Sequence, residues 1–121
     1  MLRRLAVVRV VSLHHVNVRV DDLAAAAAFY ESVFGLERID RPDAMPGEGW
    51  WYDLGDGRQL HVSEGGAGVA DSKQHFCVLV DDWRGAIADA RNAGLDVEVR
   101  EPTGQAFVRD PAGNRIELNQ A

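Results

Sequence analysis

The chain has a single cysteine, Cys77, among its 121 residues. One thiol cannot form an intrachain disulfide, so nothing indicates an oxidising compartment, and a zinc or iron–sulfur site built from several cysteines is excluded. We therefore expect a cytoplasmic protein. No apolar run approaches the roughly 18 residues of a transmembrane helix, and Arg9 interrupts the apolar opening of the chain. We expect neither a membrane anchor nor a signal peptide.

Positive charge is also scarce. Thirteen Lys and Arg residues stand against nineteen Asp and Glu residues, which gives a net charge of -6 and a pI near 5.1. No basic cluster follows position 4, and this argues against binding to a nucleic-acid backbone. The composition is 46% hydrophobic and 26% charged. These values fit one compact domain over residues 1–121.

An internal repeat organises the chain. The segment His15–Asp22 matches His75–Asp82, sixty residues later, with five of eight positions identical. Each copy continues with a helix-like stretch that ends at a glycine, Gly35 or Gly94, as a left-handed C-terminal cap requires. We therefore predict two similar modules. The first module is predicted over about 12–64 and the second over about 73–119. Residues 1–11 precede them as an N-terminal arm, which is either an extra strand or frayed.

Each module is expected to contain a strand, a helix and three further strands, from its hydrophobic alternation and its turn residues. In the first module the strands are predicted at 13–20, 36–41, 49–54 and 58–63, with a helix at 22–34. In the second they are predicted at 74–80, 96–100, 105–109 and 114–119, with a helix at 82–93. Asp22 and Asp82 stand where the helices begin and are predicted to cap them.

Strand alternation places four potential metal ligands opposite the hydrophobic stripes. His15 and His75 occupy equivalent positions in the first strands of the modules, and His61 and Glu117 do so in the last strands. A pseudo-twofold axis between the modules would let the four side chains converge. Three imidazoles and one carboxylate suit a divalent metal ion, namely Zn, Ni, Co, Fe or Mn, and leave room for two neighbouring substrate oxygens.

The alternative is that these histidines bind only protein groups. A single histidine on a strand more often contacts a backbone group or a carboxylate than a metal, and His14, on the valine side of its strand, fits that description. For the set of four, this alternative requires that three histidines and one glutamate occupy equivalent positions of the two modules by chance. We therefore predict metal binding by the set.

Four motifs are typical of one known group of proteins. They are His15-Val-Asn-Val-Arg-Val-Asp-Asp-Leu23, then Phe29-Tyr30 with Val33-Phe-Gly-Leu36, then His75-Phe-Cys-Val-Leu-Val-Asp-Asp82, and Asp110-Pro-Ala-Gly-Asn-Arg-Ile-Glu-Leu118. Through them residues 12–119 resemble the vicinal oxygen chelate superfamily, the glyoxalase, bleomycin-resistance and extradiol-dioxygenase group. The resemblance implies an α+β fold. Two βαβββ modules would form an incompletely closed mixed β-barrel with helices on the outside, often in a homodimer.

The resemblance also implies a ligand set. The family's first-strand histidine falls on His15, its fifth-strand histidine on His75 and its last-strand glutamate on Glu117. The fourth ligand, which is glutamate, glutamine or histidine in different members, falls on His61, and Gln59 has the parity to replace it. Glyoxalase I proper has a carboxylate at this position, so His61 counts against glyoxalase I activity.

These ligands indicate a glyoxalase-like, metal-dependent enzyme of the lyase or isomerase type that acts on a small oxygenated molecule. Glu117 is the candidate catalytic base. No evident group of basic residues suits the carboxylates of glutathione or the phosphates of coenzyme A, which counts against both substrates. At least one ring of the aromatic triplet at 50–52 is expected to line the binding site. The candidate substrate-binding residues are Asn17, Arg19, Trp50, Tyr52 and Gln59.

Other functions stay open. A metal-free dimer that sequesters an antibiotic, as bleomycin-resistance proteins do, is the first alternative. An Fe(II) extradiol dioxygenase with two histidines and one glutamate is the second, and a fosfomycin-type thiol transferase ranks below it. We expect a small-molecule ligand, no nucleic acid, no membrane and a homodimer. The sequence leaves open the metal, the substrate, and whether the site lies within one chain or across a dimer interface.

Overall fold

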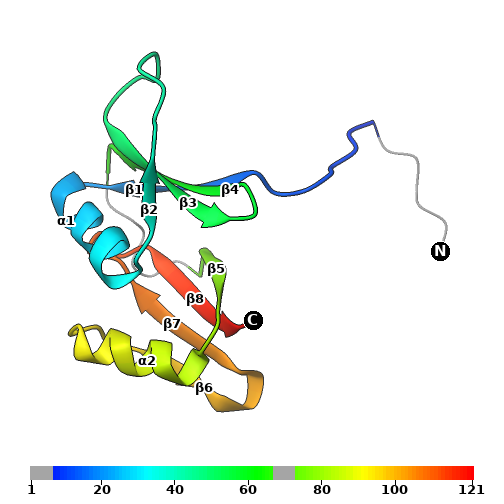
Figure 1. Ribbon diagram of the computed structural model, residues 1–121, viewed down its shortest axis with the longest axis vertical. Helices are drawn as coiled ribbons and strands as arrows, with labels where there is room; N and C mark the ends of the chain where they lie inside the picture. The colour runs from blue at the N-terminus through cyan, green and yellow to red at the C-terminus, as the bar shows by residue number, and fades with distance from the viewer. Residues whose placement is uncertain (1–6, 67–72) are drawn as a thin grey trace.

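The computed structural model describes residues 7–66 and 73–121, which form two four-stranded sheets with accompanying helices (Figure 1). The first module contains β1 (His15–Val20), α1 (Leu23–Ala27), the π-helical turn η1 (Ala28–Val33), β2 (Glu37–Ile39), β3 (Gly49–Gly55) and β4 (Arg58–Glu64). The second contains β5 (His75–Val80), α2 (Trp83–Asn92), β6 (Glu98–Arg100), the 3-10 turn η2 (Glu101–Thr103), β7 (Gln105–Arg109) and β8 (Arg115–Gln120).

The two sheets repeat one topology. The strand orders are β1-β4-β3-β2 and β5-β8-β7-β6. In each sheet the first and last strands of the module pair in parallel, and the other neighbours are antiparallel. This confirms the predicted α+β fold of two βαβββ modules. The sheets do not close on each other, as expected of an incompletely closed barrel.

The first helix differs from the prediction of one continuous helix over 22–34. The α-helix ends at Ala27, and the backbone continues as a π-helix to Val33, where the N–H of Phe34 donates to the carbonyl of Phe29 at 3.1 Å. A segment of six residues is too short for sequence periodicity to distinguish the two, since Phe29 and Tyr30 are buried while Val33 is 37% exposed. The wider turn leaves the adjacent rings of Phe29 and Tyr30 both buried.

Both helices begin at a side-chain cap, as predicted. The carboxylate of Asp22 accepts the N–H of Ala25 at 3.0 Å, and that of Asp82 accepts the N–H of Gly85 at 3.0 Å. Each cap satisfies a backbone donor that the helix leaves free and opposes the positive end of the helix dipole. The helices of both modules therefore start from the same local signal.

Hydrogen bonds from one turn of the second module join it to the first module. Asp110, only 4% exposed, accepts the hydroxyl of Tyr30 at 2.7 Å and the backbone N–H groups of Ala112 and Asn114. The side-chain amide of Asn114 donates in turn to the carbonyl of Arg19, at the end of β1. A buried carboxylate needs such partners to remain in the protein interior. The turn between β7 and β8 is thereby joined to both the helix and the first strand of the other module.

The N-terminal arm leads away from both sheets (Figure 1). Residues 7–14 lie outside helices and strands, and Val7, Val11 and Leu13 are largely exposed. Over residues 7–11 the structure therefore has an arm and not an extra strand; residues 1–6, the rest of the predicted arm, lie outside the described residues. Within the described residues, no helix has both the length and the apolarity to cross a membrane.

Candidate metal centre

The first pair of predicted ligands lies on the polar face of the first sheet. His15 comes from β1 and His61 from β4, and their rings stack with centroids 4.0 Å apart and planes 21° apart. The indole of Trp51, directly opposite His61 on β3, covers the other side of that imidazole at 3.8 Å and 3°. His61 is thus held between two rings and is 7% exposed. Its orientation is fixed before any ligand binds.

The environment keeps the His61 ring neutral. Burial, together with the nearby charges of His15, His14 and Arg41, lowers the pKa of His61 to about 4. The ring therefore carries no charge near pH 7 and has a free lone pair on one nitrogen, which is the form that binds a metal. Its Nε2 lies 2.8 Å from the amide oxygen of Gln59.

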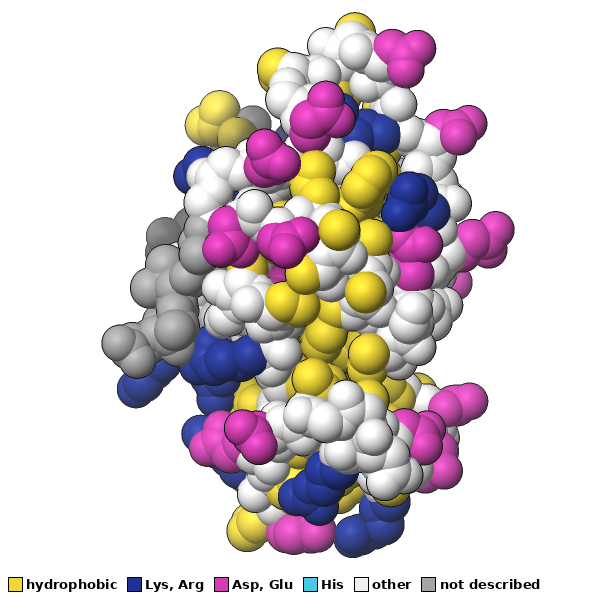
Figure 2. Space-filling view, turned by 90° about the vertical axis from the view of Figure 1, so that its left-hand side faces the viewer, with side chains coloured by type: hydrophobic (Ala, Val, Ile, Leu, Met, Phe, Trp, Pro, Cys, Tyr) yellow, Lys and Arg dark blue, Asp and Glu magenta, His cyan; other side chains and the backbone are white. Residues whose placement is uncertain are grey.

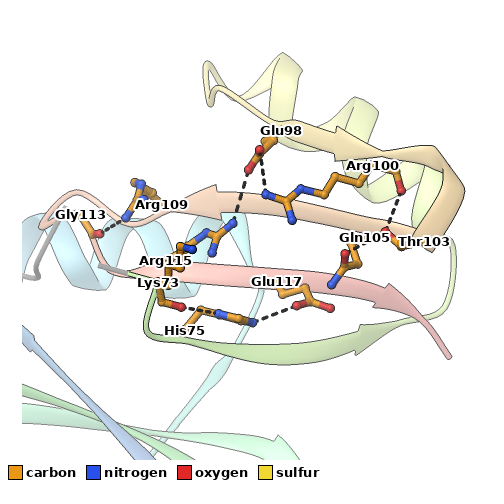
Figure 3. Close-up of polar contacts among 10 residues, drawn as sticks. All are labelled: Lys73, His75, Glu98, Arg100, Thr103, Gln105, Arg109, Gly113, Arg115 and Glu117. Atoms are coloured by element: carbon orange, nitrogen blue, oxygen red, sulfur yellow. Dashed lines mark hydrogen bonds and ion pairs between the residues drawn. The ribbon is translucent and has the colours of Figure 1, made fainter. Parts of the chain in front are cut away.

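The second pair lies on the polar face of the second sheet (Figure 3). His75 on β5 places Nε2 at 2.9 Å from Oε1 of Glu117 on β8, and Nδ1 at 2.8 Å from the carbonyl of Lys73. Both ring nitrogens therefore face acceptors. A cation placed between Nε2 and the carboxylate would interact favourably with both groups. A histidine that donates Nδ1–H to a carbonyl is a typical oriented metal ligand.

Glu117 is ionised in this environment. Burial opposes its ionisation, but hydrogen bonds from Gln105, His75 and Asn119 outweigh burial and hold the pKa of Glu117 below its ordinary value. Its Cα partner on β5 is Cys77, whose pKa burial and the neighbouring Glu117 raise to about 11. Near pH 7 the second sheet thus offers a carboxylate, while the thiol of Cys77 stays protonated.

The four predicted ligands come together as two pairs, one on each sheet. Among residues 7–66 and 73–121, no three His, Cys, Asp or Glu side chains lie close enough together to hold one metal ion. The donor types fit a divalent ion, since they comprise two stacked imidazoles in one pair and an imidazole with a carboxylate in the other. Each pair alone supplies two of the four predicted protein ligands.

A groove of about 1190 Å³ opens between the modules. One histidine of each pair, His15 and His75, borders it, and much of the remaining wall is apolar, including Phe34 and Phe76. Leu79, on the edge strand β5, also lines it and is 70% exposed. Hydrophobic side chains also form a band along the face that carries the helices (Figure 2). The groove wall and this band both present apolar side chains to solvent (Figure 2).

The candidate substrate-binding residues are divided between the two faces of the first sheet. Asn17 and Gln59 share the face of the histidines, where Asn17 accepts the hydroxyl of Ser63 at 2.7 Å. Arg19, on the same face, donates to the carbonyl of Gly65 at the end of the module.

Trp50 and Tyr52 lie on the opposite face, against the helix. The indole of Trp50 donates to the carbonyl of Leu23 at 2.9 Å, and the hydroxyl of Tyr52 donates to Glu31 at 2.8 Å. Both side chains therefore hold the helix on the sheet and lie away from the candidate ligands. The aromatic residue beside the histidines is Trp51. The signal that identifies it is its place opposite His61 in an antiparallel pair, which requires the register between β3 and β4.

The second sheet also carries basic residues that sequence inspection missed. Arg100 and Arg115 lie on its polar face and both contact Glu98 (Figure 3). They are 15 positions apart in the sequence and come together because β6, β7 and β8 are neighbours in the sheet. This pair is recognised only from the register of β6, β7 and β8, which the sequence did not supply.

Comparisons with known proteins agree with this architecture. A model of the Glyoxalase/Bleomycin resistance protein/Dioxygenase superfamily matches residues 12–118. No curated protein matches the sequence significantly. Three solved structures with the same fold have different functions, according to their names.

The fosfomycin resistance protein FosX from Mesorhizobium loti is similar with a TM-score of 0.77 and 18% identity, over 93% of this chain and 94% of its own. The lactoylglutathione lyase from Agrobacterium tumefaciens is similar with a TM-score of 0.70 and 26% identity, over 91% of this chain and 93% of its own. An antibiotic-binding protein from a Streptomyces species is similar with a TM-score of 0.76 and 23% identity, over 93% of this chain and 98% of its own. The likeness thus establishes the fold and leaves the reaction undetermined.

Proposed function

Because the chain belongs to the Glyoxalase/Bleomycin resistance protein/Dioxygenase superfamily, we propose that it is a metal-dependent enzyme of the lyase or isomerase type. Its substrate is a small oxygenated molecule that chelates a divalent ion through adjacent oxygens. His15, His61, His75 and Glu117 hold the ion. The observation that carries the proposal is the orientation of His75, whose Nδ1 is bonded to a carbonyl while Nε2 points at a buried carboxylate.

The metal would supply Lewis-acid chemistry, that is, polarisation of a substrate carbonyl. The chain's own residues supply the remaining functions. Glu117 is ionised and largely buried, so its carboxylate can accept a proton from a carbon beside that carbonyl. His61 stays neutral between Trp51 and His15 and therefore binds without first losing a proton.

We further propose that two copies of the chain build each complete site. The pair on the first sheet of one copy would meet the pair on the second sheet of its partner, and a twofold axis would produce two equivalent sites. Two observations support this arrangement. Each described chain carries two separate pairs of donors, and the apolar groove between the modules lacks a cover of its own in the described residues.

The alternative with specific support is an antibiotic-binding protein that performs no chemistry. The volume and apolar wall of the groove suit a large organic ligand, and the fold is shared with an antibiotic-binding protein. This alternative requires no metal. It differs from the first proposal in that the two histidine-containing pairs would have no role in ligand binding.

The direct test is metal analysis of protein purified without chelator. We expect one divalent ion per chain, and we expect chelator-treated protein to take it up again. Glu117→Gln should lower metal affinity by at least about tenfold, since even a residue that only orients a ligand is worth that much. Glu101→Gln, an exposed glutamate paired with Arg84, is the matched control and should leave affinity unchanged.

A panel of dicarbonyl compounds, catechols and antibiotics then separates the functions. Turnover of a dicarbonyl compound supports the lyase or isomerase. Oxygen uptake with catechol by iron-loaded protein would favour the dioxygenase. A chain that cannot be loaded with any divalent ion, yet binds an antibiotic tightly without turnover, would replace the enzyme by the binding protein.

A further inference from the structure

Two arginine side chains share one aromatic ring on the polar face of the second sheet. The guanidinium of Arg115 lies 3.8 Å from the ring centroid of Phe107, and that of Arg100 lies 5.0 Å from it. Both distances are within the range of a cation–π contact. The side chain of Arg115 is only 13% exposed, so the ring and the neighbouring strands fix its position.

The arginines adjoin the candidate metal ligands. Arg115 is the Cα partner of His75 across β5 and β8, and Phe107 is the Cα partner of Glu117 across β7 and β8. The imidazole of His75 meets the ring of Phe107 edge-on, with centroids 5.5 Å apart. The guanidinium group of Arg115 and the imidazole of His75 thus contact the same ring. A molecule bound at the pair has Arg115 as its neighbour.

The positive charge of the two arginines is only partly compensated. Within residues 7–66 and 73–121, Glu98 is the one carboxylate paired with them, at 3.2 Å from Arg100 and 3.5 Å from Arg115, and its side chain is 56% exposed (Figure 3). Glu117 is not paired with the arginines, since its hydrogen bonds go to His75, Gln105 and Asn119, and in the loaded site the metal ion would balance its charge. With the metal ion bound, two guanidinium groups against Glu98 would leave a local positive charge in a chain whose net charge is -6. Such a region attracts anions selectively.

An exposed ion pair of this kind is weak and readily exchanged. Solvent-exposed pairs are worth about 1 kcal/mol or less, so the carboxylate of a ligand can take the place of Glu98. A guanidinium group binds a carboxylate through two parallel N–H···O bonds, and this geometry favours a planar anion. The strands of the second sheet therefore provide both donors.

We propose that Arg115 and Arg100 bind a carboxylate of the substrate next to the metal-chelating oxygens. The substrate class is accordingly narrowed from a chelating oxygenated molecule to a chelating carboxylic acid. This inference rests on the proposed function, because the arginines act on a molecule held at His75 and Glu117.

Catechol and protocatechuate form a matched pair of probes. Both offer two adjacent oxygens to a metal, and protocatechuate adds one carboxylate. Calorimetric titration of zinc-loaded protein should give a dissociation constant about tenfold or more lower for protocatechuate, the effect of one charge-assisted hydrogen bond. Arg115→Gln should abolish this preference and leave catechol and zinc affinity unchanged. Equal binding of the two probes by the unaltered protein would overturn the inference.

Two further variants identify the groups involved. Glu98→Gln removes the competing carboxylate and should strengthen protocatechuate binding, whereas Arg84→Gln, an arginine of α2 paired with Glu101, should change nothing. An unchanged melting temperature in Arg115→Gln shows that the loss of the carboxylate preference is not caused by unfolding. Retention of the carboxylate preference by folded Arg115→Gln would also contradict the proposal.

Failure of the metal site and failure of the arginine site have different signatures. If no metal is taken up, the proposed function fails. The arginines can still be tested in metal-free protein, where protocatechuate and not catechol should shift the Nε–H resonance of Arg115 in an NMR titration. If metal and catechol bind normally while the carboxylate has no effect, only the carboxylate inference fails.

Discussion

At the scale of single residues, ring stacking and hydrogen bonds fix the candidate ligands before anything binds. His61 lies between the rings of His15 and Trp51, and His75 is oriented by the carbonyl of Lys73. Side chains held in this way lose little further freedom when they bind a ligand. The neighbouring Trp50 has a different role, because strand alternation directs its indole to the helix.

The two adjacent tryptophans should therefore respond differently to substitution. Trp51→Leu removes the ring that covers His61, and we expect metal affinity to fall by about tenfold, as for other groups that orient a ligand. Trp50→Phe removes the hydrogen bond to Leu23 and should lower the free energy of unfolding by about 1 kcal/mol. Zinc titration and urea denaturation of both variants measure the two effects.

In Trp50→Phe, metal affinity should be unchanged, so each variant serves as the control for the other. Loss of metal affinity in Trp50→Phe alone would mean that the face assignments of these two residues are reversed.

At the scale of the elements, the turn between β7 and β8 is the main polar connection from one module to the other. Its Asp110 accepts hydrogen bonds from its own turn and from Tyr30 of η1. Such a buried carboxylate is stabilised only while its donors are present. The Asp-Pro-Ala-Gly-Asn motif therefore has a structural role in joining the modules, in addition to leading into the strand of Glu117.

Removal of the Tyr30 hydroxyl should destabilise the fold more than removal of the Tyr52 hydroxyl. Tyr30→Phe deprives buried Asp110 of a donor, which costs about 2 kcal/mol for a bond to a charged group. Tyr52→Phe breaks a bond to the partly exposed Glu31 and should cost about 1 kcal/mol or less. Thermal denaturation at pH 7 compares the two. Equal losses would argue against the importance of the connection between modules.

The same tyrosine predicts a loss of stability in alkaline solution. Burial and the adjacent Asp110 raise the pKa of Tyr30 above its ordinary value of about 10. The folded state thus holds this proton more tightly than the unfolded state, and stability is lost as the pH rises above about 10. Tyr52, whose pKa burial and Glu31 raise to about 12, acts in the same direction.

Urea denaturation between pH 8 and pH 11, values that bracket the ordinary tyrosine pKa of about 10, should show the smaller loss in Tyr30→Phe. The unaltered chain retains both contributions and should lose more stability. A steeper decline in Tyr30→Phe would contradict this assignment.

At the scale of the whole molecule, the duplicated topology places one ligand pair on each sheet, and the described chain does not unite them. The groove between the modules is large, apolar and bordered by one histidine of each pair. We accordingly expect a homodimer in solution. Its defining property would be that each metal ion has ligands from both chains.

Mixing two inactive variants tests this directly. The first carries His15→Ala with His61→Ala, and the second carries His75→Ala with Glu117→Gln. If each site uses both chains, heterodimers formed by refolding the mixture contain one site with all four ligands, and we expect one metal ion per heterodimer. Neither variant alone should bind metal tightly. Metal analysis of the isolated heterodimer measures the result.

If each site lies within one chain, every site in the mixture lacks two ligands, and the mixture should remain metal-free. That outcome would contradict the shared site. It would leave the ligand assignment intact if the unaltered protein binds metal.

The sequence predicted the order and approximate bounds of the strands and helices well. The repeat of His15–Asp22 at His75–Asp82, the aspartate caps and the glycines after the helices are local signals, and local signals fix local structure. The π-helical turn over Ala28–Val33 was missed because its hydrophobic pattern is close to that of an α-helix. Alternation also identified the polar face of each first and last strand.

What the sequence alone determined is which side chains share a face of a strand and that two modules have the same plan. Which faces and strands become neighbours was decided by the tertiary structure. Trp51 covers His61, and Arg115 joins Arg100 over Phe107, only because strands distant in the sequence pair in a particular register. The physical reason is that alternation acts between adjacent residues, whereas a binding site depends on the hydrogen-bonded pairing of whole strands.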